Sequence, residues 1–196
     1  MAFTLKRNFG ANDWCRNWVQ LSNGDIYVGL EKTVEKSTDG GATFASIFSD
    51  ANTAELRIFV LNDTLFKIKR YAPFGLGQYI LMKRQTNSWI QIAVLNAAAG
   101  PGVGQIQDIK VRGAKAYFAC ANKVFEFNGV AAPVEIATNT GFSAIDATTG
   151  GDVYWIQKTI VGPTTTSTIK KMGWNFEHRL LRNSWKQPSG SAACSG

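Results

Sequence analysis

Residues 18–30 read WVQLSNGDIYVGL, and this stretch decides the fold class. Apolar residues flank a polar Ser-Asn-Gly-Asp segment, which is turn chemistry, so the stretch predicts a strand, a tight turn and a second strand. The same order returns at 58–70 (IFVLNDTLFKIKR), 108–120 (DIKVRGAKAYFAC) and 143–158 (SAIDATTGGDVYWIQK). Four copies of one small unit indicate a repeat architecture.

Each copy is followed by a second hairpin pattern. Its two strands are expected at 33–37 and 44–48, at 79–85 and 89–94, at 123–127 and 134–137, and at 168–172 and 176–181. Four strands in about 40 residues are typical of one blade of a β-propeller. We therefore predict an all-β fold, a small β-propeller of about four four-stranded blades. A β-sandwich with irregular loops is the alternative, but it would not explain the repeated order.

The repeats also set the expected boundaries. The propeller is expected over residues 1–186, and its blades near 14–50, 55–96, 105–138 and 142–182. The alternating segment 3–9 is a candidate extra strand that completes the last blade and closes the ring, since closure protects sheet edges. Residues 187–196, QPSGSAACSG, are expected to form a flexible tail.

Composition narrows the class of protein further. Of 196 residues, 45% are hydrophobic and 18% are charged, which indicates a packed chain rather than a disordered one. A net charge of +7 favours anionic partners such as nucleic acid, an acidic glycan or an acidic protein face. A solvated basic surface is the simpler interpretation of the same charge.

The cysteines and the N-terminus bear on location. Cys15, Cys120 and Cys194 lack metal-type spacing, and an odd number argues against a disulfide framework, so we expect free thiols in a reducing compartment. The N-terminus has no apolar core of a signal peptide, and no apolar run is long enough for a membrane span. The sequence predicts synthesis in the cytoplasm without a signal peptide.

The motif KSTDGGATF at 36–44 carries a family resemblance. Ser37, Asp39, Gly41 and Thr43 alternate and end in the aromatic Phe44. This pattern resembles the Asp-box, or BNR repeat, of sialidases and many other β-propellers. There it forms a structural turn between the third and fourth strands of a blade. The match covers nine residues strictly and one blade of four.

The resemblance to sialidases does not extend to catalysis. Sialidases use three arginines, a tyrosine with a glutamate partner and an acidic residue, and the arginines here stand in no such context. The chain is also shorter than six blades require, and His178 is its only histidine. We predict no enzymatic activity, no catalytic residues, no metal site and no cofactor.

A basic hairpin is the candidate partner-binding site. Lys67, Lys69 and Arg70 lead into YAPFGLGQY at 71–79, and basic residues follow the return strand. Alternation places Lys67 and Lys69 on one face, so the hairpin is expected to present a basic rim with aromatic residues at its tip. The candidate residues are Lys67, Lys69, Arg70, Tyr71, Phe74, Tyr79, Lys83 and Arg84.

These observations favour a non-enzymatic structural or adaptor propeller that mediates protein–protein contacts. Small all-β chains rich in Asn, Thr and Gly resemble virion proteins of tailed bacteriophages, which implies a tail, neck or fibre-attachment part. The expected partners are other protein subunits of an oligomeric assembly. A carbohydrate-binding, lectin-like propeller that recognises an anionic glycan is the alternative. Nucleic acid is less favoured, because the charge is spread along the chain.

Overall fold

A computed structural model of the chain describes residues 15–71, 78–96, 106–120, 123–138, 142–148, 150–161, 164–172 and 174–180. These residues form sixteen β-strands and no helix. The strands make four antiparallel sheets, each of four strands in chain order. The predicted all-β class with four four-stranded blades is confirmed.

The strands of each blade follow one another along the chain. Blade 1 contains β1 (Asn17–Gln20), β2 (Ile26–Gly29), β3 (Thr33–Ser37) and β4 (Ala45–Ser49). Blade 2 contains β5 (Thr53–Leu61), β6 (Thr64–Tyr71), β7 (Gln78–Gln85) and β8 (Ser88–Asn96). Blade 3 contains β9 (Ile106–Arg112), β10 (Lys115–Cys120), β11 (Lys123–Phe127) and β12 (Val134–Thr138). Blade 4 contains β13 (Phe142–Ala147), β14 (Val153–Val161), β15 (Thr164–Lys171) and β16 (Trp174–Leu180). The expected N-terminal strand at 3–9 and the tail at 187–196 lie outside the described residues.

Local turn chemistry explains why these hairpins form. Between β5 and β6, Asn62 and Asp63 both have positive φ, 49° and 52°. Two consecutive positive φ angles are the requirement of a type I′ turn, whose twist matches that of the paired strands. The Asp63 carboxylate also accepts hydrogen bonds from the Ser22 amide (2.8 Å) and hydroxyl (2.5 Å) in the β1–β2 turn. The two turns therefore link blade 1 to blade 2.

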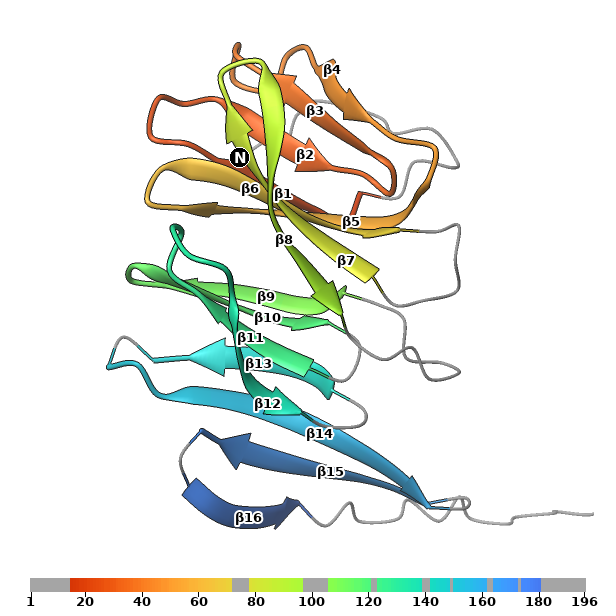
Figure 1. Ribbon diagram of the computed structural model, residues 1–196, viewed down its shortest axis with the longest axis vertical. Coiled ribbons are helices and arrows are strands. Elements are labelled where there is room, and N and C mark those ends of the chain that lie inside the picture. Colours follow the sequence, from red (N-terminus) through yellow and green to blue (C-terminus); the bar gives the residue numbers. More distant parts are fainter. Residues whose placement is uncertain are drawn as a thin grey trace, which may run out of the picture.

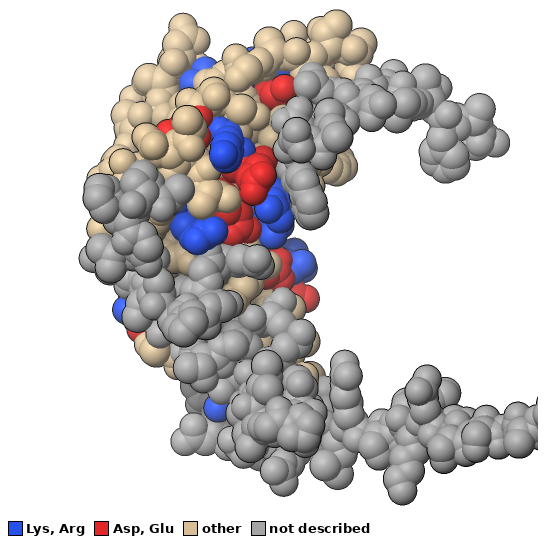
Figure 2. All heavy atoms as spheres, turned by 90° about the vertical axis from the view of Figure 1, so that its right-hand side faces the viewer, with Lys and Arg blue, Asp and Glu red and all other residues tan. Residues whose placement is uncertain are grey.

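The four blades are stacked along an arc. Figure 1 shows them following one another along the long axis, from blade 1 at the top to blade 4 at the bottom. Extensive contacts between described strands of different sheets join consecutive blades only. Turned by 90°, the molecule is hollowed on one side (Figure 2).

Every blade has two faces, because side chains alternate along a strand. We call the face toward the preceding blade the N-side face, and the face toward the following blade the C-side face. In β6, Leu65 and Lys67 lie on the N-side face, whereas Phe66 and Ile68 lie on the C-side face and join the core shared with blade 3. The positions of the candidate functional residues are described below by these two faces.

One apolar core fills each junction between blades. Blades 1 and 2 share the core around Tyr27, Leu56 and Ile58, and blades 3 and 4 share the core around Tyr117 and Trp155. The largest core lies between blades 2 and 3, where rings stack and meet edge to face. Its ring pairs include Phe59–Phe66 (5.3 Å between centroids), Phe66–Phe127 (5.1 Å) and Phe118–Phe125 (5.6 Å).

Candidate functional site

Ser37 ends β3, and the other residues of the motif that resembles an Asp-box lie in the loop that joins β3 to β4, the third and fourth strands of blade 1. The buried Ser37 hydroxyl accepts from the Gly41 amide (2.9 Å) and donates to Asp39 Oδ1 (2.7 Å). Asp39 in turn accepts from the Thr43 amide (2.9 Å) and the Thr43 hydroxyl (2.6 Å). Gly41 has a φ of +91°, a conformation that favours glycine. Phe44 lies against Gly41, at 3.9 Å from where a Cβ would stand.

These hydrogen bonds have an electrostatic consequence for the loop. The hydroxyl and amide of Thr43, followed by the Ser37 hydroxyl, hold the pKa of Asp39 well below its usual range. All of these donors come from the loop itself. The carboxylate of Asp39 therefore stabilises the turn.

Lys67 does not contribute to a basic surface. Its side chain is buried on the N-side face of blade 2, and its ammonium nitrogen lies over the ring of Phe48 and 4.1 Å from the centroid of the Trp89 ring. Burial, reinforced by the nearby charge of Lys69, lowers the pKa of Lys67 to about 6. The expectation that Lys67 lies on an exposed rim is wrong, because blade 1 covers this face of the hairpin.

Lys69 and Tyr71 continue the same face and are also engaged within the chain. Lys69 Nζ pairs with Asp50 Oδ2 at 2.5 Å, and this contact lowers the pKa of Asp50. Arg84 lies over the Trp89 ring, 5.6 Å from its centroid. Lys69, Tyr71 and Arg84 are half-buried, so the basic hairpin contacts blade 1 and offers only part of its charge to solvent.

The remaining hairpin residues divide between the two faces. Tyr79 is buried on the C-side face, opposite Arg70, and burial raises its pKa. A surface role for Tyr79 is therefore wrong as well. Arg70 and Lys83 are half-buried, and Phe74 lies outside the described residues. The structure thus does not gather the eight predicted residues into one surface, and a partner-binding role for the half-buried ones stays a prediction.

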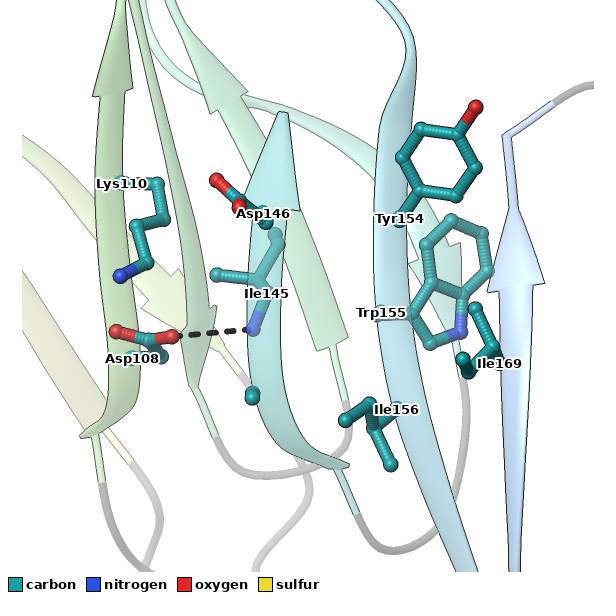
Figure 3. Close-up of a pocket in the computed structure, with 9 residues that line it drawn as sticks. Asp108, Lys110, Ile145, Asp146, Tyr154, Trp155, Ile156 and Ile169 are labelled. Carbon is teal, nitrogen blue, oxygen red and sulfur yellow. Dashed lines mark hydrogen bonds between the residues drawn. The ribbon is translucent and has the colours of Figure 1, made fainter. Parts of the chain in front are cut away.

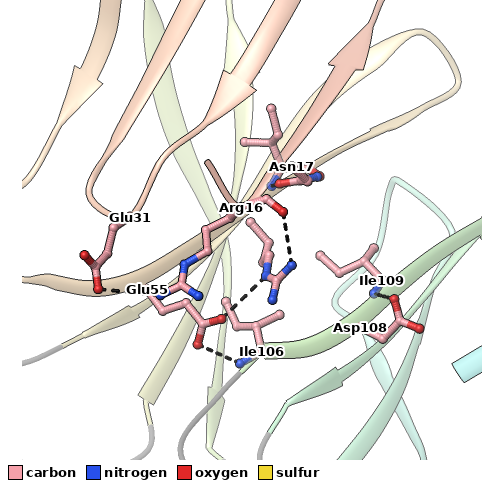
Figure 4. Close-up of polar contacts among 9 residues, drawn as sticks. Arg16, Asn17, Glu31, Glu55, Ile106, Asp108 and Ile109 are labelled. Atoms are coloured by element: carbon pink, nitrogen blue, oxygen red, sulfur yellow. Dashed lines mark hydrogen bonds and ion pairs between the residues drawn. The ribbon is translucent and has the colours of Figure 1, made fainter. Parts of the chain in front are cut away.

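A repeated polar contact joins the first strands of consecutive blades, and Figure 4 shows the one between Glu55 and Ile106. At each junction, an oxygen of a side chain in one blade accepts a hydrogen bond from a backbone amide of the next blade. The pairs are Asn17 Oδ1 with Ile58 N (3.1 Å), Glu55 Oε2 with Ile106 N (2.9 Å) and Asp108 Oδ2 with Ile145 N (3.1 Å). These bonds fix the position of each first strand against its neighbour.

Charges of both signs surround these contacts. Arg57 Nε lies 3.5 Å from Glu55 Oε1, and Arg16 Nη2 lies 3.6 Å from Glu31 Oε1. Figure 2 shows Lys, Arg, Asp and Glu side chains of both signs along the inner edge of the arc. Acidic and basic groups therefore pair with one another along the described part of the inner edge.

A concave site lies on blade 4. It is a hollow of about 580 Å³ whose lining comes from β9, β13, β14 and β15. The register pairs Ala144 with Ile156, Ile156 with Ile169 and Asp146 with Tyr154, so these side chains share the C-side face of the blade. Figure 3 shows Asp108 and Lys110 on β9 at one side of the hollow, and Tyr154 and Ile156 on β14 at the other.

This C-side face of blade 4 combines apolar and acidic groups. Tyr154 and Ile156 are half-buried, and the Ile169 side chain is 38% exposed. Asp146 is exposed and pairs with Arg112 at 3.1 Å. Such a surface can bind an apolar side chain of a partner or the face of a sugar ring.

Sequence reasoning missed this face, although the sequence holds a signal for it. Tyr154 and Ile156 alternate with the core residues Val153 and Trp155, so β14 is apolar on both faces. An apolar C-side face in the last repeat is where a further blade would be expected to pack.

Other classes of site find little support in the described residues. They contain no group of three or more His, Cys, Asp or Glu side chains that could hold a metal ion. Nor do they include a helix long and apolar enough to cross a lipid bilayer. Cys15 is an exposed free thiol and Cys120 a buried one, whereas Cys194 and the His178 side chain lie outside the description.

Comparison with known proteins shows the fold alone. No protein-family model matches the sequence, and no curated protein matches it. Among solved structures, a protein from Bacteroides caccae aligns with a TM-score of 0.58 and 12% identity over 90% of this chain and 64% of its own. The extracellular domain of BT4673 from B. thetaiotaomicron aligns with a TM-score of 0.56 and 13% identity, over 84% of this chain and 22% of its own.

The third neighbour is the α-L-arabinofuranosidase arb93a from Fusarium graminearum, in complex with an iminosugar inhibitor. It aligns with a TM-score of 0.52 and 12% identity over 95% of this chain and 71% of its own. The BT4673 domain and the arabinofuranosidase are propeller-like, in agreement with the four sheets. In the alignments, the chain spans less than two thirds of the length of the B. caccae and BT4673 chains.

Proposed function

We propose that the protein is a non-enzymatic structural or adaptor propeller that binds other protein subunits through its end blades. The observation that carries this proposal is the C-side face of blade 4. The corresponding faces of blades 1, 2 and 3 are each packed into a core shared with the next blade. On blade 4, Ile169 instead stays 38% exposed beside a hollow of about 580 Å³. Exposed apolar surface at a hollow is typical of protein interaction sites.

The assembly we propose is a tailed-bacteriophage virion, in which the chain is a tail, neck or fibre-attachment part. Support comes from the β-propeller fold and from the resemblance of small Asn-, Thr- and Gly-rich all-β chains to such virion proteins. Both are arguments by analogy, since fold alone does not determine function. The expected partners are the neighbouring subunits of that assembly.

Co-expression tests the proposal directly. The chain is produced with the products of the neighbouring genes, and complexes are isolated by size exclusion and weighed by light scattering across concentration and salt. A complex of defined stoichiometry is expected, and an Ile169→Asp variant should weaken it at least ~10-fold by loss of apolar burial. A chain that forms no assembly with itself or with any of these products would overturn the proposal.

Carbohydrate binding is the second candidate, favoured by the chemistry of the same hollow. Tyr154 offers an aromatic face, and the carboxylates of Asp108 and Asp146 lie at the rim. Aromatic rings beside polar groups suit sugar rings, whose hydroxyls need partners once an apolar face is buried. A glycan array with the wild-type chain and a Tyr154→Ala variant separates the two candidates. Binding that Tyr154→Ala removes would favour the lectin-like function, and no binding would exclude it.

A further inference from the structure

The first strands of blades 2, 3 and 4 share one position whose side chain packs onto the preceding blade, and the first strand of blade 1 has the same position. In blade 2 it is Ile58, which pairs with Lys67 on the N-side face. The register gives the same position to Ile109 in blade 3 and to Ile145 in blade 4. In blade 1 it belongs to Trp18, which pairs with Val28.

The three isoleucines are inserted into the blade before them, and Trp18 is not. Ile58 is fully buried and Ile145 is 2% exposed, whereas the Trp18 side chain is 65% exposed. Ile109 packs against the core between blades 2 and 3. Trp18 therefore occupies the inserting position of a junction whose other half is not found among the described residues around it.

The other half of such a junction is present at the opposite end of the chain. Ile58 rests on Gly29 of the C-side face of blade 1, 3.2 Å from where a Cβ would stand, beside Asn17 Oδ1. The register puts Ile156 of blade 4 at the place of Gly29, and Ala144 at the place of Asn17. The C-side face of blade 4 thus has the positions that receive an inserted side chain, and Trp18 occupies the inserting position.

The two receiving positions in blade 4 differ in size from those in blade 1. The position next to the inserted residue is Asn17 in blade 1, Arg57 in blade 2 and Asp108 in blade 3, but only Ala144 in blade 4. The small side chain contributes to a hollow of about 580 Å³, where Trp18 would replace the isoleucine of the internal junctions. At this position the larger Trp18 would face a smaller side chain, whereas at the position of Gly29 it would face the larger Ile156.

From this we infer that the partner of the blade 4 face is a second copy of this chain, bound head to tail through Trp18 of its blade 1. The inference rests on the proposed function and names the subunit that the end blades bind. Two copies of four blades would form one ring of eight, which lies within the usual size of β-propellers. In such a ring both copies use both end faces, so two identical junctions close the assembly.

Light scattering of the wild-type chain provides the first test. The expected mass at high concentration is twice 21.4 kDa. Trp18→Asp and Ile169→Asp should each raise the Kd of the dimer at least ~10-fold, since each places a charge in an apolar junction. Val130→Asp is the matched control, because Val130 is 85% exposed but lies outside both end faces. Its Kd should stay that of the wild type.

Mixing the two variants tests the head-to-tail direction. In a mixed pair one junction joins two unaltered faces, so the mixture should dimerise better than either variant alone. Hydrogen exchange of the wild type, which requires no variant, should slow in β1, β14 and β15 as concentration rises, and not in β11 or β12.

Three outcomes would overturn the inference. A wild-type mass of 21.4 kDa at all concentrations excludes the second copy; a complex with a neighbouring gene product would then still support the proposed function. A dimer that neither variant weakens uses another surface. Variants that fail to rescue each other indicate a junction that is not head to tail.

Discussion

The side-chain amide of Asn17 makes two hydrogen bonds to the backbone of Ile58. Its Nδ2 donates to the Ile58 carbonyl at 2.5 Å, and its Oδ1 accepts from the Ile58 amide at 3.1 Å. One side chain of blade 1 thus satisfies both backbone polar groups of a blade 2 residue whose own side chain is fully buried between the two blades. The contact fixes two adjacent first strands in register at the inner edge of the arc.

Asn17→Leu is expected to lower the free energy of unfolding by about 1–3 kcal/mol, because it leaves the amide and carbonyl of Ile58 without hydrogen-bond partners. Urea denaturation followed by circular dichroism measures the change. Gln20→Leu is the control, since Gln20 is exposed on the same strand, and it should change stability by less than about 0.5 kcal/mol. Equal effects of the two variants would contradict a structural role of the contact.

Lys67→Met is expected to stabilise the protein by about 1–3 kcal/mol at pH 7, the usual cost of a buried polar group without a partner. Lys67 Nζ is buried and has no hydrogen-bond partner, and a thioether packs well against the rings of Phe48 and Trp89. Lys115→Met, at an exposed lysine that pairs with Glu126, should bring no such gain. A loss of stability in Lys67→Met would contradict this account.

The same lysine predicts a pH dependence of stability. Its pKa is about 6 in the folded chain and 10.5 when unperturbed, so between these values the unfolded state binds more protons. The contribution of Lys67 to stability therefore rises with pH from about 6 toward 10.5, and its cost is largest below pH 6. Denaturation midpoints measured across this range should rise less steeply in Lys67→Met than in the wild type.

The blade pattern could be predicted from the sequence because it depends on signals between residues close in the sequence. Turn residues such as Asn62 and Asp63 and the alternation around them act over a few positions, and the strands formed where these signals stood. The burial of Lys67 could not be predicted in this way. Alternation placed it on a face with Lys69, but only the packing of Phe48 from blade 1 decides that this face is interior. Trp18 shows the converse. A large apolar residue in a strand is expected to be buried, and only the arrangement of the blades shows that Trp18 is exposed.

Asp39→Asn is expected to lower the melting temperature at pH 7, because the carboxylate accepts hydrogen bonds from Thr43 and Ser37 that hold its pKa low. A depressed pKa contributes stability above the pKa of the unfolded state, and this contribution is lost as pH falls through the folded pKa. The difference between wild type and variant should therefore shrink in strong acid. Thermal scans from pH 7 down to pH 2 measure it, and a difference independent of pH would contradict the assignment.

The described cysteines should differ in reactivity toward a thiol reagent. Cys15 is exposed, whereas Cys120 is buried in the core between blades 2 and 3, and burial raises the pKa of its thiol. We expect Cys120 to react at least ~100-fold more slowly than Cys15, since access requires opening of the blades. Peptide mapping by mass spectrometry after timed alkylation separates the sites. Comparable rates would indicate that the junction between blades 2 and 3 opens readily.

The order of the blades also has a kinetic consequence. The hydrogen bonds between first strands join residues 41, 51 and 37 positions apart, and each closes between consecutive blades. Once two consecutive blades have emerged from the ribosome, both halves of the junction between them are available. Folding can then advance from the N-terminus one blade at a time during synthesis, with each finished blade serving as the template for the next.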